Sequence, residues 1–274
     1  MTDTKEVADL HLHTLFSYDG KSAAEEYVLA AVAAGDKVIG FSEHYDYDCV
    51  LSGTSEDSPL CDLRAYKAEI ERLREKYEGK IEILFGIEFG YDKRAHAKYA
   101  ELAEKFRFDY AINSVHLFRG TDFWLADKIE KYSVSAKELY KIYLETVEES
   151  VFADYPFDII GHLGYPLRYS PCKGKNFSYE DFAGEYERIL KAIAKSGKCL
   201  EINSSTKTDK PFMPNEEVIE AYAEFGGKKL SFGSDAHSVR RYSEGKKTVS
   251  EAAQKFGLKL FCGKSGNIER FSEE

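Results

Sequence analysis

Cysteine is sparse in this chain of 274 residues, and its cysteines do not stand at metal-ligand spacing. The five are Cys49, Cys61, Cys172, Cys199 and Cys262. An odd number, wide separations and the lack of a CxxC pair argue against a disulfide framework and against a thiolate zinc site. We therefore expect reduced thiols, and a metal site would have to use other side chains.

Long apolar runs are also missing. No segment approaches the roughly 20 apolar residues that a membrane-spanning helix needs. The first residues, MTDTKE, lack the basic and then apolar pattern of a secretory signal. The sequence thus predicts a soluble, cytoplasmic protein without a membrane partner.

Positive charge is in deficit, with 38 Lys and Arg against 48 Asp and Glu and a net charge of −10. Nucleic acid polymers are bound by clustered cations, so no such partner is expected. A small phosphorylated substrate is compatible with this balance, because divalent cations in a pocket reverse the potential that carboxylates create. No feature of the sequence sets the oligomeric state.

Glycine-rich loops of the GxGxxG or GxxxxGK type follow none of the expected strands, so an open nucleotide-binding sheet lacks its fingerprint. Instead, short apolar segments alternate with longer amphipathic ones, which is typical of repeated β-α units. Seven such units predict a single α/β domain over residues 1–274, a TIM-like barrel with its site at the carboxyl ends of the strands. An open doubly wound sheet is the alternative.

The boundaries follow from these patterns. Expected strands cover residues 7–13, 38–43, 81–88, 110–116, 158–163, 199–203 and 230–235, with a possible eighth at 258–262. Expected helices cover residues 22–34, 62–78, 94–106, 135–151, 178–196, 215–226 and 246–256. The longest irregular segments, 45–61, 117–134 and 164–177, are expected to form loops over the site.

Six of the seven histidines stand at the ends of expected strands. His11 and His13 close the first strand, and alternation along a strand points both side chains the same way. The other four are His44, His116, His162 and His237. Neutral imidazoles converging from rigid strands are well placed to hold a divalent cation. His96, in the charged helix segment KRAHAK, is expected to be solvated.

Carboxylates recur at the same kind of position. Glu88 and Asp235 end two strands, and both are candidate ligands. Glu43 directly precedes His44, but alternation points it away from the ligands. Glu201 is a candidate either for orienting a ligand imidazole or for a salt bridge. The single tryptophan, Trp124, is a candidate for the floor of a substrate pocket, but packing in the core or on the surface is the favoured expectation.

The segments HxHTxxSxDG, SEH, GIE, SVH, GH and SDAH, in this order, resemble the PHP (polymerase and histidinol phosphatase) family over nearly the whole chain. IGFSEH, DIIGH and EIN are most similar to its histidinol-phosphate phosphatase branch. The resemblance implies a distorted seven-stranded (β/α) barrel that holds two to three divalent transition metal ions, drawn from zinc, iron and manganese. Imidazole and carboxylate ligands suit these ions independently of the family.

The resemblance also implies a ligand set. The first ion would take His11, His13, Glu88 and Asp235. The second would take His116 and His162 and share Glu88, and the third would take Asp19, His44 and His237. Nine ligands for three ions leave open positions, which mark a catalytic site.

The reaction expected from such a site is hydrolysis of a phosphomonoester by metal-activated hydroxide, with Glu88, Asp235 and His237 as metal-site residues. L-histidinol phosphate is the leading substrate. The alternatives are a PHP phosphatase or phosphodiesterase for another small phosphoester such as a nucleotide, an amidohydrolase-type hydrolase, and a metal-binding module without activity. No expected strand ends in the lysine that amidohydrolases usually carboxylate.

The substrate side departs from the histidinol phosphatase pattern. Gly164 stands where that branch tends to carry aspartate, and no arginine follows Glu201-Ile202-Asn203. The cationic candidates for holding phosphate are Arg168, Lys207, Lys210, Arg240 and Arg241.

Overall fold

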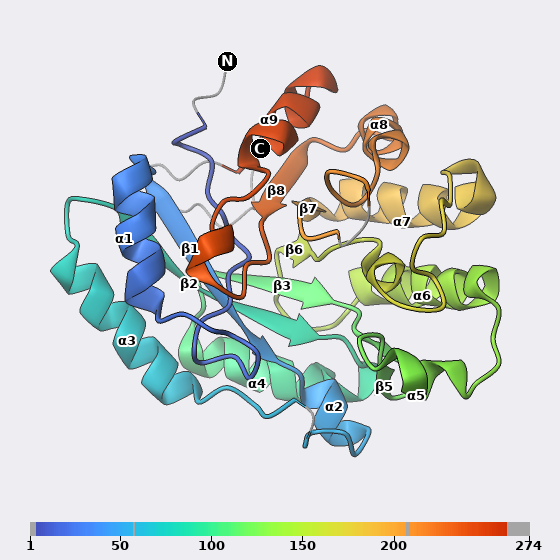
Figure 1. The fold of residues 1–274 in the computed structure, drawn as a ribbon, viewed down its shortest axis with the longest axis horizontal. Helices are drawn as coiled ribbons and strands as arrows, with labels where there is room; N and C mark the ends of the chain where they lie inside the picture. Colours follow the sequence, from blue (N-terminus) through green and yellow to red (C-terminus); the bar gives the residue numbers. More distant parts are fainter. Residues whose placement is uncertain (1–3, 57, 207–208, 262–274) are drawn as a thin grey trace.

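The computed structural model describes residues 4–56, 58–206 and 209–261. Its centre is a curled, parallel sheet of seven strands in the order β1-β2-β3-β6-β7-β8-β9 (Figure 1). These strands are β1 Val38–Tyr45, β2 Glu82–Gly90, β3 Tyr110–Ser114, β6 Ile159–Ile160, β7 Cys199–Asn203, β8 Lys229–Gly233 and β9 Lys259–Leu260. The predicted parallel α/β fold is confirmed, whereas closure into a complete barrel is not established by this sheet.

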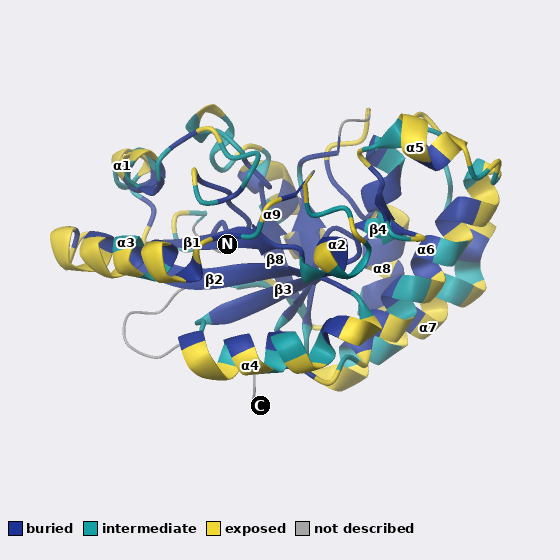
Figure 2. Ribbon diagram, turned by 90° about the horizontal axis from the view of Figure 1, so that it is seen from below, coloured by how far each residue is buried: buried dark blue, intermediate teal, exposed yellow. Residues whose placement is uncertain are grey.

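Helices cover the outer side of the sheet, and Figure 2 shows buried strands beside helices with exposed outward faces. The long ones are α1 Ala24–Ala34, α3 Leu63–Lys76, α4 His96–Phe106, α6 Ala136–Val151, α7 Ala183–Ser196, α8 Glu216–Glu224 and α9 Lys246–Lys255. Single 3-10 turns lie at Lys93–Ala95, Tyr165–Arg168, Glu180–Phe182 and Val239–Arg241. No helix in the described residues is both long and apolar enough to cross a bilayer.

The helices form where apolar residues recur on one face. In α7, Tyr186, Ile189, Leu190 and Ile193 are buried at helical spacing, while the charged residues between them face solvent. At the start of α8, the Asn215 side chain accepts a hydrogen bond from the backbone N–H of Val218, as expected of an N-cap. Such local signals explain why the long helices are predictable from the sequence.

The first expected strand, residues 7–13, is not a regular strand. Asp9 forms isolated bridges with Ile39 and Phe232, and Leu12 forms one with Ala236. The Asp9 carboxylate accepts hydrogen bonds from the backbone N–H groups of Ser234 (3.0 Å) and Ser243 (3.1 Å). The Asp9 side chain therefore takes the place of a backbone acceptor where the segment 7–13 runs beside the end of β8. The expected regular strand was wrong here, because the apolar pattern does not reveal this contact.

Besides the 3-10 turn Tyr165–Arg168 in the expected loop 164–177, the other two expected loops contain helices or strands. Residues 45–61 include α2 Tyr47–Leu51, and residues 117–134 include the β4 Leu117–Phe118 and β5 Thr121–Asp122 hairpin and α5 Ala126–Glu130. Arg119 and Gly120, between β4 and β5, both have positive φ angles, +50° and +76°. The two turn residues of tight hairpins of this kind are usually Asn-Gly or Asp-Gly. Arg-Gly gives no such signal, so the hairpin was not predicted.

One aromatic ring fills the space against β1 and β2. Tyr110 is buried, and its hydroxyl donates to the carbonyl oxygens of Leu10 (2.7 Å) and Phe41 (3.0 Å). A Cβ atom at Gly86 would lie 2.2 Å from Cζ of Tyr110 and 2.6 Å from the carbonyl oxygen of Phe41. Glycine is therefore required at this position by packing.

The Gly86→Ala substitution is expected to lower the free energy of unfolding by about 1 to 3 kcal/mol, because the new methyl group overpacks the ring. Urea denaturation would measure the change. Gly184→Ala, in the first turn of α7, is the matched control, since its Cβ would meet only Nη1 of Arg188 at 3.6 Å. Equal effects of the two substitutions would contradict the packing argument.

Candidate metal centre

The carboxyl ends of the strands bring all nine predicted ligands together. His44 and Glu88 lie near the ends of β1 and β2, and His116 and His162 follow β3 and β6. Asp235 and His237 follow β8, and His11, His13 and Asp19 come from the segment beside β1. Of the nine, seven are buried, His44 among them with a residue exposure of 8%, whereas Asp19 and His237 are partly exposed.

Glu88 is at the middle of this cluster. Its Oε1 lies 3.2 Å from Nε2 of His11 and 3.0 Å from Nε2 of His162. The same oxygen lies 3.2 Å from Nε2 of His116, while Oε2 lies 2.8 Å from Nδ1 of His44. A carboxylate with imidazoles on both oxygens has the arrangement of a bridging ligand.

Two further carboxylates complete the cluster. Oδ1 of Asp235 lies 3.4 Å from Nε2 of His13 and 3.6 Å from Nδ1 of His237. Asp19 lies between two imidazoles, 2.8 Å from Nε2 of His237 and 3.8 Å from Nε2 of His44. Each of the three carboxylates is thus shared between at least two histidines.

The cluster fits divalent cations. Four sets of three side chains have ligand atoms within 4.8 Å of one another. They are His13, His44 and His237; His11, Glu88 and His162; His11, His13 and Asp235; and His44, Glu88 and His116. Within the described residues, buried Nε2 of His11 and His13 and Oε2 of Glu88 form no hydrogen bond of acceptable geometry, although other polar atoms of the cluster lie close to them. Buried polar atoms without partners are costly, and a cation would satisfy these at once.

The charges of the cluster reinforce one another. Burial alone would raise the pKa of Glu88, but His11, His44 and His116 hold the pKa of this carboxyl well below its usual range. Burial opposes the charge on His44, yet Glu88, Asp46 and Asp19 raise its pKa to about 10. Around Glu88 the site therefore favours positive charge, whereas burial and the neighbouring His44 and His237 hold the pKa of His13 well below its usual range.

Carboxylates outside the cluster contact the other ring nitrogens of the histidines. Oε1 of Glu201 lies 2.6 Å from Nδ1 of His11, and Oδ1 of Asp46 lies 3.1 Å from Nδ1 of His116. Such contacts fix the tautomer that leaves Nε2 directed at the cluster. The orienting role considered for Glu201 matches its position, whereas Asp46 was not singled out, although it stands only two residues after His44.

Glu43 faces away from the ligands, as alternation along β1 predicts. Its carboxylate accepts hydrogen bonds from the hydroxyl (2.7 Å) and N–H of Thr14 and from the Ser17 hydroxyl (2.6 Å). Oγ of Ser17 also lies 3.2 Å from Nδ1 of His13. Glu43 thus anchors the loop that follows His13.

A cavity of about 510 Å³ opens onto the ligands. Tyr18, Trp124, Tyr165 and Tyr169 contribute aromatic surface to its walls. Trp124 is 40% exposed, so it borders the pocket and does not pack in the core. The pocket position was the less favoured expectation for Trp124, because the wall is built by contacts between distant loops.

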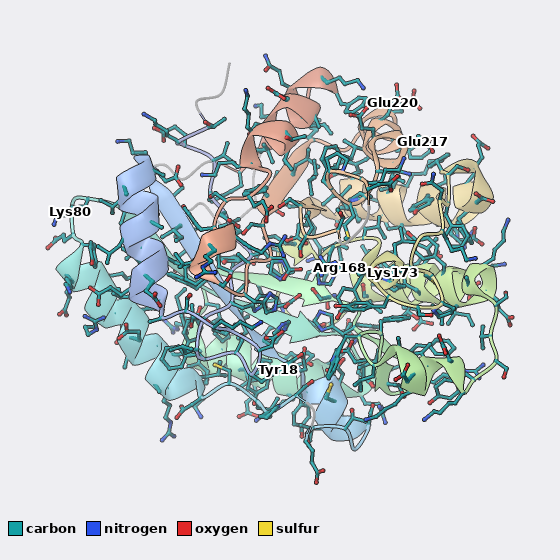
Figure 3. The ribbon with its side chains drawn as sticks, in the orientation of Figure 1. Tyr18, Lys80, Arg168, Lys173, Glu217 and Glu220 are labelled. Atoms are coloured by element: carbon teal, nitrogen blue, oxygen red, sulfur yellow. The ribbon has the colours of Figure 1, made fainter. Side chains whose placement is uncertain are left out.

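Two of the five cationic candidates for holding phosphate lie at the metal pocket. Arg168 is buried, with Nη1 2.6 Å from Oδ2 of Asp235 and Nη2 donating to Oδ1 of Asn203 at 2.8 Å. Figure 3 shows Arg168 among the side chains at the arrowhead end of the sheet. Arg241 lines the pocket and donates to Oγ of Ser205 at 3.3 Å. These two residues of the predicted set therefore border the metal cluster.

The remaining candidates lie elsewhere. Arg240 is exposed and is absent from the described pocket lining, and Lys210 lines a neighbouring cavity. Lys207 lies outside the described residues. Lys21 was not among the predicted cations, yet it lines the pocket. It stands two residues after the expected ligand Asp19, in the same loop. His96 is half-buried against Tyr155, contrary to the expected solvated position.

Metal-stripped protein is expected to become less stable between pH 7 and pH 9. The pKa of His44 is raised from 6.5 to about 10 in the folded state, so its contribution is complete below pH 6.5 and is lost as pH rises toward 10. The loss should reach at least about 1.4 kcal/mol, the equivalent of one pKa unit. Urea denaturation with a chelator present would measure it.

Burial raises the pKa values of Asp9 and Asp122 to about 6, below this pH window, whereas it raises the pKa of Asp48 well above its usual value, which adds to the loss in the same direction. Zinc-loaded protein is the control, because bound cations replace the protons and should reduce the slope. A stability of the stripped protein that is constant or rises from pH 7 to pH 9 would contradict the electrostatic picture.

Comparisons with known proteins agree with this geometry. A family model for the PHP domain matches residues 9–205. The chain is 30% identical over 240 residues to the histidinol-phosphatase of Lactococcus lactis subsp. lactis (strain IL1403), with 85% of each chain covered. It is 29% identical over 235 residues to a probable histidinol-phosphatase of Clostridium acetobutylicum, covering 84% of this chain and 86% of that protein.

A solved structure is also similar. The crystal structure of histidinol phosphate phosphatase from Lactococcus lactis, in complex with zinc, L-histidinol and phosphate, matches with a TM-score of 0.81. The sequence identity is 26%, and the match covers 93% of this chain and 95% of that one. The order of the motifs, the geometry of the cluster and these matches lead to one conclusion. The chain belongs to the PHP domain family.

Proposed function

We propose that this protein is a metal-dependent phosphomonoesterase that hydrolyses L-histidinol phosphate to L-histidinol and phosphate. The observation that carries the proposal is the set of nine imidazole and carboxylate side chains that meet around Glu88 at a pocket of about 510 Å³. The names of the relatives support this substrate. So does the similar structure, which holds zinc and both products of that reaction.

Two to three divalent ions, drawn from zinc, iron and manganese, would be held by this set. We assign His11, His13, Glu88 and Asp235 to the first, His116, His162 and Glu88 to the second, and Asp19, His44 and His237 to the third. Such ions supply Lewis acidity, which lowers the pKa of water toward about 7 and offsets charge on the phosphate. Mixed nitrogen and oxygen donors support transition metals over magnesium or calcium.

The surrounding side chains keep this set in place. Glu201 and Asp46 orient two imidazoles, and Arg168 holds Asp235 through its second oxygen. At the open side, Lys21 and Arg241 are placed to attract the phosphate, because they are the cations that line the pocket together with Arg168 in the described residues.

We also propose that the segment 7–13 closes the sheet into a barrel. Asp9 bridges to Ile39 in β1 and to Phe232 in β8, which places the segment 7–13 between the two strands. This contact supports a distorted seven-stranded barrel made of the segment and β1, β2, β3, β6, β7 and β8, with β9 paired only to the start of β8. It explains how His11 and His13 reach ligands that come from the other strands.

A hydrolysis screen of purified, metal-quantified protein tests the function. The panel should contain histidinol phosphate, other phosphomonoesters, nucleotides and bis-p-nitrophenyl phosphate. We expect the highest kcat/KM for histidinol phosphate and loss of activity after chelation. A preference for the diester or for a nucleotide would replace this proposal by the alternative phosphoesterase, and full activity without metal would refute the mechanism.

A further inference from the structure

A second cavity, of about 350 Å³, lies beside the metal pocket. The 3-10 turn Tyr165–Arg168 and the residues before it separate the two. Tyr165 and Arg168 line the metal pocket, whereas Leu163 and Leu167 line the second cavity. The two cavities therefore share a wall, but their linings have no described residue in common.

The inner surface of the second cavity is apolar. Phe177, Phe212 and Met213 line it together with Leu163, and Leu163, Phe212 and Met213 are no more than 4% exposed. Tyr140 also lines the cavity, and its ring centroid lies 5.2 Å from that of Phe177. Flat rings and a flexible thioether make a surface suited to a planar apolar group.

The rim carries positive charge in a protein whose net charge is −10. Lys173 and Lys175 are exposed there, and the salt bridges of the described residues include neither. Lys210 is a third lysine of the lining, and Asp209 is the acidic residue described in it. Lys173 and Lys175, which form no salt bridge among the described residues, can attract an anion to the mouth of the cavity.

We propose that this cavity is a second ligand site, which binds a small organic anion with a planar apolar body. Its volume falls in the usual range for small-molecule sites, which are mostly apolar with a few polar groups that set orientation. The body would lie against Phe177, Phe212 and Met213, and the anionic group would face Lys173 and Lys175.

The shared wall gives such a ligand a route to the metal pocket. Leu167 precedes Arg168, and Met213 exchanges two backbone hydrogen bonds of 2.8 Å with Asn203. Arg168 and Asn203 are the residues that contact Oδ2 of Asp235. A ligand packed on Leu167 and Met213 would thus contact the residues next to those that support one metal-site carboxylate.

Binding is tested with 8-anilinonaphthalene-1-sulfonate, an anionic aromatic dye, by fluorescence titration of the full-length protein without substrate. We expect saturable binding of one dye molecule. The double variant Lys173→Ala, Lys175→Ala should raise its Kd about three- to tenfold, whereas Asp209→Asn should lower it. Binding of the uncharged N-phenyl-1-naphthylamine should be unchanged in the double variant.

The matched control is Lys80→Ala, Lys247→Ala, because both lysines are exposed and do not line the cavity. Figure 3 shows Lys80 on the opposite side of the molecule from Lys173. Equal dye affinity in the double variant and the control would overturn the proposal. Displacement of the dye by inorganic phosphate in metal-loaded protein would overturn it too, by placing the dye in the metal pocket. Neither result depends on turnover, so failure here is separate from failure of the proposed phosphatase activity.

Discussion

The Glu88→Gln variant is expected to lose metal and to show a kcat/KM about a thousandfold below that of the wild type. Glutamine preserves the shape of the side chain but removes the negative charge between His11, His44, His116 and His162. A neutral amide cannot bridge two cations as a carboxylate does, and its NH2 group would face imidazole nitrogens that should bind metal. Metal content by mass spectrometry and steady-state kinetics on the same sample would measure both effects.

Glu43→Gln is the matched control, because both glutamates are fully buried and each lies two residues before the end of its strand, in the neighbouring strands β1 and β2. The Glu43 carboxylate accepts from Thr14 and Ser17 and is not among the metal-cluster contacts. Its replacement should cost about 1 to 3 kcal/mol of stability while metal content stays near that of the wild type. If Glu43→Gln lost as much metal as Glu88→Gln, the central position of Glu88 would be wrong as an explanation of metal binding.

The contrast between these two glutamates shows what a sequence can predict. Alternation along a strand is a local rule, so it placed Glu43 and His44 on opposite sides and His11 and His13 on the same side. The carboxyl ends of parallel strands meet in space whatever their separation in sequence. These two rules gathered the strand-end histidines with Glu88 and Asp235, whereas Asp19 was a candidate only through the resemblance to the PHP family.

Features that depend on contacts between distant segments were beyond these rules. The irregular segment 7–13 owes its shape to Asp9 and to loops more than 200 residues away. The wall position of Trp124 depends on an Arg-Gly hairpin without a sequence signature. Local patterns describe how a segment folds, whereas these positions depend on which other segment packs against it.

Arg168 is the residue for which structure adds most to the sequence. Its sequence context only made it one of five cations near the site. In the structure its guanidinium holds Oδ2 of Asp235 and the side chain of Asn203, and its own exposure is 4%. Burial raises the pKa of Asp235, but the charge of Arg168, and to a smaller extent that of His11, keeps the pKa of this carboxyl well below its usual range. Arg168 thus secures the charged form and the orientation of a proposed metal ligand.

The Arg168→Met variant is expected to lower kcat/KM about a hundredfold, because it leaves the buried Asp235 without its partner at the edge of the phosphate pocket. Arg168→Lys should recover only part of the loss, since an ammonium group retains the charge but not the two-pronged contact with Asp235 and Asn203. Stability should fall less in zinc-loaded than in stripped protein, because bound cations would still compensate Asp235.

Arg240→Met provides the comparison, since Arg240 is exposed near the same loop and its loss should leave kcat/KM within about twofold of the wild type. Kinetics and urea denaturation of the three variants, each with and without zinc, separate the possible roles. If Arg168→Met and Arg240→Met behaved alike, the support of Asp235 by Arg168 would have no catalytic consequence. If kcat/KM fell in Arg168→Met but equalled that of the wild type in Arg168→Lys, charge alone would be required. The geometry of the guanidinium contact would then not matter.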